Sequence, residues 1–321
     1  MLDEPTLDDD DGVSVSRWLL LSGNRLVVTA GIVVAFVAIL AALTALGVIS
    51  VGLSSATRTL LASGITSGLL TLITVTLSIN QLILSRLFGS PNELSDRLDG
   101  TVNFRRNVER IAGTSTSPTD PREFLALITE TIHDQVTDLD LSSVDEEAGD
   151  YQSALASYSG SLTDSVRDQD DTIGVLSKIM GAEYAEYMEA TRYVKNEFED
   201  EFSEGTVSEL EDVLELLESI AIARQFFKTL AIQQDLARLS RFIAYTGLSA
   251  FVTTIALTLL YKSSSGAYVQ PETLTAVVLL GFGVIISPLA VLIAYILRVA
   301  TIAFYTVSVG PFVPPKEKSE G

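Results

Sequence analysis

Cysteine is absent from the 321-residue chain, and histidine occurs only once. Without a thiol the protein can form no disulfide, no thiolate nucleophile and no cysteine-ligated metal site. The single histidine, His133, lies near Glu130 and Asp134, but this spacing is a motif of low specificity, and packing or surface exposure is the favoured interpretation. The sequence also lacks GxxxxGK(S/T), GxGxxG, HExxH and GxSxG motifs. We therefore expect a protein that is not an enzyme and that has neither a metal nor a cofactor.

Basic residues are scarce, because 21 Lys and Arg stand against 41 Asp and Glu, a net charge of −20. The stretch from Leu87 to Ser240 contains 32 acidic and 12 basic residues, so its own charge of −20 equals the net charge of the whole chain. Nucleic acid is not an expected partner, since phosphate binding needs clustered cations. A carboxylate excess with few lysines is typical of proteins kept soluble in high salt, and we interpret the charge in that way. The acids between Asp138 and Glu147 lack the spacing of an EF-hand loop and indicate a solvated loop.

Four apolar runs are each long enough to cross a bilayer core, which takes about 20 helical residues. No soluble domain of this size could bury four such runs, so the sequence predicts an all-α protein with four transmembrane helices in two pairs. The fourth run contains Pro288, where we expect a hinge or kink, because proline removes a backbone donor. The four runs are Leu26–Ile49, Thr57–Phe88, Phe242–Tyr261 and Thr273–Leu297.

Twelve Lys and Arg residues flank these runs on one side, whereas only Arg58 and Lys262 fall on the other. The positive-inside rule then predicts a multi-pass protein of the cell membrane with both termini and the central region in the cytoplasm. The expected regions are an acidic disordered tail with an interfacial segment (1–24), the first two spans (25–88), an acidic cytoplasmic helical domain (89–240), the last two spans (241–309) and a C-terminal tail (310–321).

The central domain shows helical periodicity throughout and no alternating strand pattern. Asp120 and Pro121 mark a helix start, and Asp171–Phe202 is predicted as one continuous helix. Leu141–Gly149 is predicted as an acidic loop. The last helix begins with Thr206 as its cap and repeats apolar residues in coiled-coil fashion. No helix breaker interrupts it, so we expect it to continue to Tyr261 in the third span, about 80 Å in all.

Polar side chains recur at steps of three and four along the second run, which places them on one face of a helix. Asn80 and Thr76 lie beside this face. Because an unsatisfied amide is costly in hydrocarbon, the face is expected to meet protein or water. Two interpretations stay open, namely helix packing and a water-lined pore in a homo-oligomer. The stripe consists of Ser63, Ser67, Thr71, Thr74, Ser78, Gln81 and Ser85.

The segment LSINQLILSRLFGSPNEL (Leu77–Leu94), together with the paired spans, resembles an uncharacterised group of haloarchaeal-type four-span membrane proteins. The layout of two spans, a helical insertion and two spans is also similar to that of bestrophin-like anion channels, although their motifs are absent and the likeness is one of architecture. The first resemblance implies no activity. We expect a non-enzymatic sensor or scaffold whose helical domain self-associates or binds a cytoplasmic protein, and the alternative is a homo-oligomeric ion channel lined by the second span.

Overall fold

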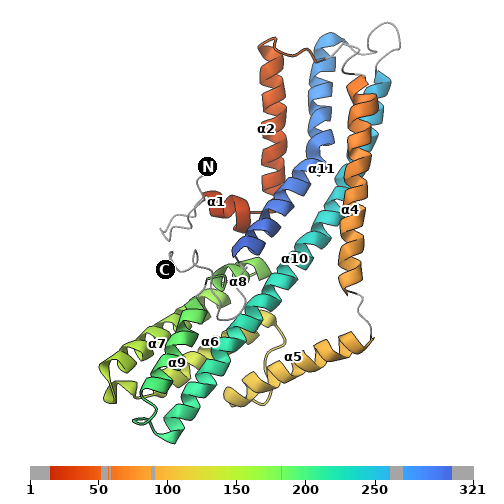
Figure 1. Cartoon of the computed structure of the whole chain (residues 1–321). Helices are drawn as coiled ribbons and strands as arrows, with labels where there is room; N and C mark the ends of the chain where they lie inside the picture. The colour runs from red at the N-terminus through yellow and green to blue at the C-terminus, as the bar shows by residue number, and fades with distance from the viewer. Residues whose placement is uncertain are drawn as a thin grey trace. The chain divides into compact units, whose positions relative to one another are not determined.

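The computed structural model describes residues 15–51, 57, 59–87, 91–181, 183–260 and 270–305 (Figure 1). Every regular element in these ranges is a helix, and four of the helices are long and apolar enough to cross a membrane. The predicted all-α fold with four spans is confirmed. The chain divides into two compact units. The membrane unit comprises the described residues of Met1–Phe88 and Gln233–Thr301, and the acidic unit comprises those of Gly89–Ile232 and Ile302–Gly321.

The membrane unit begins with two short helical pieces, α1 (Val15–Arg17) and the π-helical η1 (Trp18–Ser22), and then enters its first span. Asn24 caps that span, because its side chain accepts a hydrogen bond from the Leu26 amide at 2.9 Å. Residues 1–14 of the predicted tail and interfacial segment (1–24), as well as the C-terminal tail (310–321), lie outside the described residues. The spans are formed by α2 (Arg25–Ala45), by the π-helical η2 (Leu60–Ile65) with α4 (Thr66–Leu87), by the C-terminal part of α10 (Glu204–Leu260), and by α11 (Pro271–Tyr305).

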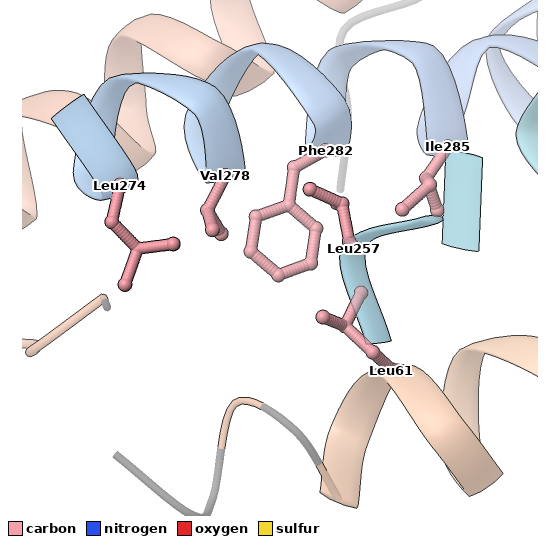
Figure 2. Packing of buried hydrophobic residues seen from close by; sticks show 6 residues of the cluster. All are labelled: Leu61, Leu257, Leu274, Val278, Phe282 and Ile285. Carbon is pink, nitrogen blue, oxygen red and sulfur yellow. The ribbon is translucent and has the colours of Figure 1, made fainter. Parts of the chain in front are cut away.

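One apolar core holds α10, α11 and η2 together, as Figure 2 shows. Four residues of α11 at steps of four, four and three point toward Leu257 of α10 and Leu61 of η2. Gly281 permits this approach, since a Cβ at its position would lie 2.5 Å from a methyl carbon of Leu257. The α11 residues are Leu274, Val278, Phe282 and Ile285.

A second core cluster joins Leu239 and Ile243 of α10 to Val291 and Tyr295 of α11. α11 continues through Pro288 without a break, and Figure 1 shows that it changes direction along its length. The helix also extends eight residues beyond Leu297, the expected end of the fourth run, to Tyr305.

The acidic unit consists of α5–α9, the short helix η3, the N-terminal part of α10 and the last residues of α11 (302–305). Its core packs α6 against α7, with Leu125, Ile128 and Leu155 fully buried. His133 belongs to this contact, because its Nδ1 lies 2.8 Å from the carbonyl oxygen of Ala156. The helices are α5 (Pro91–Ile111), α6 (Pro121–Asp138), η3 (Leu141–Ser143), α7 (Glu146–Arg167), α8 (Thr172–Lys178) and α9 (Glu183–Glu197).

Three local predictions for this unit were wrong. The single helix expected over Asp171–Phe202 is broken between α8 and α9, where the carbonyl of Met180 accepts a hydrogen bond from the buried Arg224 at 2.7 Å. Such a tertiary contact replaces the local helical bond. Most of the expected acidic loop Leu141–Gly149 is also helical, since η3 covers Leu141–Ser143 and α7 begins at Glu146.

The third correction concerns the start of α10. Thr206 is not its cap, because the helix begins at Glu204 and the Ser203 hydroxyl oxygen accepts from the Thr206 amide at 3.0 Å. The Asp120 cap of α6 is confirmed by its hydrogen bond from the Arg122 amide. The unbroken course of α10 is confirmed as well, over 57 residues, or about 85 Å at the α-helical rise.

Candidate functional site

The polar face of α4 and η2 is not covered by the other helices of its own chain. All six stripe residues with described side chains are exposed, whereas α4 packs through another face. On that face Leu69 and Thr76 are buried, and Ile73 touches Gly247 of α10. The side chains of Asn80 and Ser85 lie outside the described residues. The exposed residues are Ser63, Ser67, Thr71, Thr74, Ser78 and Gln81.

Most hydroxyls of the stripe are satisfied within their own helix. Thr71 donates to the carbonyl of Ser67 at 3.0 Å, and Thr74 donates to that of Leu70 at 2.9 Å. Ser63 and Ser78 bond four residues back in the same way. These bonds lower the cost of placing the hydroxyls in hydrocarbon, because a back-bonded hydroxyl presents no free donor. The expectation that the face meets protein or water then depends mainly on Gln81. Gln81 differs, since a carboxamide has two donors and two acceptor lone pairs to satisfy.

Three charged side chains from three spans meet inside the membrane unit, a group that we call the buried charge cluster. Arg25 begins α2, Asp235 lies on α10 and Arg298 lies on α11; their exposed fractions are 3%, 0% and 5%. Nη1 of Arg298 lies 3.3 Å from Oδ1 and 3.4 Å from Oδ2 of Asp235. Arg25 and Arg298 thus face a single fully buried carboxylate, which leaves the cluster with one excess positive charge.

Backbone carbonyls hold the cation that Asp235 does not bind directly. Arg25 donates through Nε to the carbonyl of Gly23 at 3.0 Å and through Nη1 to that of Ala294 at 3.2 Å. Arg298 also donates to the carbonyl of Gly23, at 2.5 Å. Carbonyl dipoles therefore stabilise the charges in place of water, as burial of an ion requires. The result is a fixed junction of α2, α10 and α11.

The residue at the centre of this junction, Gly23, must be a glycine for a steric reason. A Cβ at its position would lie 2.4 Å from the carbonyl oxygen of Trp18 and 2.9 Å from its indole ring. The Gly23 amide donates to that same carbonyl at 2.7 Å, so η1 folds tightly against the turn before α2. Only a residue without a side chain can keep this turn and offer its own carbonyl to both arginines.

Sequence reasoning missed this cluster. Arg25 and Arg298 were counted as flanking charges for topology, and Asp235 as one acid among many. The available signal was weak: Asp235 follows an apolar stretch of α10 and lies three residues before Arg238. Arg238 itself is half exposed and lies 4.0 Å from the carboxylate, at the rim of the cluster.

The acidic unit has a polar junction of a different kind between α5 and α10. Arg110 forms ion pairs with Asp212 at 3.0 Å and with Glu215 at 2.6 Å, and these partners raise the pKa of its guanidinium. Asn107 also donates to Glu215. Arg110, Glu215 and Asn107 border a cavity of about 540 Å³. Because the arginine is more than half exposed, solvent weakens the pairs, and they position α5 more than they stabilise it.

Metal binding finds no support in the part of the chain that the structure describes, where no group of three or more His, Asp or Glu residues could hold an ion. The sequence matches a family model described as a family of unknown function (DUF7972) over residues 4–321. No curated protein and no solved structure gives a match.

Proposed function

Because the chain belongs to DUF7972, a family of unknown function, we propose a role from its own contacts: a non-enzymatic membrane sensor or scaffold in which α10 links the acidic unit to the spans. The observation that carries this proposal is the unbroken course of α10. Its N-terminal part supplies core residues to the acidic unit, including Leu210 and Leu216. Its C-terminal part supplies Ile243 and Leu257 to the membrane unit.

The buried charge cluster supports this role through its position on α10. Asp235 stands three residues after Ile232, where the acidic unit ends along this helix. Its carboxylate holds α10 to Arg298 of α11 at that point. A displacement of α10 in the acidic unit must then move the neighbouring spans or break a buried ion pair, and breaking such a pair costs about 3–5 kcal/mol. Movement of the spans together with α10 therefore costs less free energy than breaking the ion pair.

The test follows the unfolding of each unit with its own probe. Trp18, the only tryptophan, reports on the membrane unit, and a fluorophore on Tyr193→Cys reports on the acidic unit, since the chain has no other cysteine. Leu216→Ala removes a fully buried side chain of the acidic unit. If α10 couples the units, both transitions shift together, and Gln234→Pro separates them by breaking the helix. A Leu216→Ala shift confined to the Tyr193 probe would refute coupling.

A homo-oligomeric channel is the second candidate, favoured by the exposure of the α4 stripe. Copies of the chain that place these faces around a common axis would line a path with hydroxyls and the Gln81 carboxamide. Planar bilayers with the purified chain test this. Thr74→Ala and Gln81→Ala are expected to change conductance, whereas Thr76→Ala, on the covered face of the same helix, leaves it unaltered. Bilayers that stay silent over a range of salts would exclude the channel.

A further inference from the structure

The membrane unit contains a cavity of about 420 Å³ between α2, η2 and α11. Phe36 and Leu40 of α2 form one wall, and Phe282 and Ile286 of α11 form the opposite wall. Of the described residues around the cavity, only Ser50 and Thr57 are polar. Water is a poor occupant, because a buried water needs two to four polar partners. An empty space of this size would deprive its lining of van der Waals contacts.

The π-helical turn of η2 builds the third wall. Leu60 and Ile65 both line the cavity although they are five residues apart, a spacing that an ordinary α-helix would place on different faces. In η2 the wider i→i+5 turn brings them to one side, and the Thr66 hydroxyl bonds five residues back to the Leu61 carbonyl at 2.9 Å. π-turns of this kind are frequent at binding sites. Leu61 turns instead into the packed core shown in Figure 2.

The cavity lies toward the C-terminal end of the α2 span. Its lining residues on α2 are Phe36 and Leu40, about 6 Å apart along the helix at 1.5 Å per residue, and Ile49, Ser50 and Val51 follow the helix end at Ala45. The two polar lining residues, Ser50 and Thr57, follow the end of this span, where the headgroup region begins. The apolar part of the cavity therefore matches lipid hydrocarbon in chemistry.

We propose that this cavity is a binding site for one hydrocarbon chain of a membrane lipid. At about 30 Å³ for a small group, the liquid volume of one water molecule, the cavity has room for about 14 methylene-sized groups. One acyl chain fits this volume, and both chains of a diacyl lipid do not. The lipid headgroup stays at the Ser50 end and the second chain in the bilayer. This site is independent of the coupling role proposed for α10.

Native mass spectrometry tests the site with the full chain extracted from palmitoyl-oleoyl phosphatidylcholine vesicles. The wild-type protein is expected to retain one lipid molecule. Leu40→Trp fills the cavity and is expected to lower the bound fraction about tenfold or more. Ile39→Trp is the matched control, because the neighbouring residue is 58% exposed and faces away, and it should retain the lipid. Ile286→Trp fills the site from the opposite wall and should reproduce the loss.

Crosslinking of the unaltered protein gives a second readout that does not depend on how the variants fold. A phosphatidylcholine with a diazirine on one acyl chain should label α2 and α11 most strongly at Phe36–Leu40 and Phe282–Ile286. Equal labelling of all exposed apolar faces would overturn the proposal. So would equal lipid retention by Leu40→Trp and Ile39→Trp in the folded state, or a wild-type chain that binds added palmitate and no phosphatidylcholine.

Discussion

Asp235→Asn is the sharpest perturbation of the buried charge cluster, because it removes the charge and keeps the shape of the side chain. Asp235 is fully buried and is paired at 3.3 Å with Arg298, whose side chain is 6% exposed. Without the carboxylate, the guanidinium groups of Arg25 and Arg298 share a buried site with no anionic partner of comparable burial. Leaving a buried ion unpaired costs about 3–5 kcal/mol, and we expect a loss of that size in the free energy of unfolding.

The assay is reversible unfolding in mixed micelles by sodium dodecyl sulfate, followed by ellipticity and by Trp18 fluorescence. Arg238→Gln is the control, since this side chain is 54% exposed and lies 4.0 Å from the same carboxylate. We expect it to change stability by no more than about 0.5 kcal/mol.

A double-substitution cycle completes the measurement. Removing both partners with Asp235→Asn and Arg298→Gln should cost less than the sum of the two single changes, by about 0.5–3 kcal/mol, because the two groups are in contact. An Asp235→Asn protein within about 1 kcal/mol of the wild type, or strictly additive single effects, would show that water reaches the site and that the pair is not a buried one.

Three further outcomes are expected in the same assay. Gly23→Ala should lower stability by about 1–3 kcal/mol, because the added methyl group meets the backbone oxygen of Trp18, and equal stability would contradict the steric account. Tyr151→Phe should lower the free energy of unfolding by about 1 kcal/mol, because the Tyr151 hydroxyl is hydrogen-bonded to Thr191 at 2.8 Å in the core of the acidic unit. Burial also raises the pKa of this hydroxyl. Unchanged stability of the variant would mean that the bond is absent. Glu109→Gln tests pH dependence. The hydroxyl and the amide of Ser117 donate hydrogen bonds to the Glu109 carboxylate at 2.7 and 2.9 Å. These bonds hold the pKa of Glu109 below its ordinary value of 4.5. A lowered pKa stabilises the fold above pH 4.5 and stops doing so as the pH falls through the lower value, so wild type and variant should differ at neutral pH and converge in acid.

The four spans and the continuity of α10 could be predicted because both depend on local sequence. A run of about 20 apolar residues must leave water whatever its neighbours are, and a helix without breakers continues. The Asp120 cap is local in the same sense, since the carboxylate binds an amide two residues away. The break between α8 and α9 was not predicted, and the Met180 carbonyl at this break accepts a hydrogen bond from Arg224, 44 residues downstream, which is a contact that short-range periodicity does not contain.

The polar stripe of α4 shows what spacing indicates and what it leaves open. The spacing places Thr71 and Ser78 on one face, and the structure leaves both exposed. Their hydroxyls bond back to carbonyls of the same helix, which the residue names do not reveal.

Sequence alone determined the class of this protein: an all-helical chain with four apolar spans, an acidic middle and no catalytic motif. Those properties follow from composition and short-range periodicity, which a single chain carries in full. Tertiary structure decided which of the charged residues matter. Arg25, Asp235 and Arg298 are separated by up to 273 positions and look like ordinary flanking charges until three spans bring them together in one buried cluster. The apolar cavity at Leu40 is likewise invisible in the sequence, because a void is defined by what neighbouring helices fail to fill.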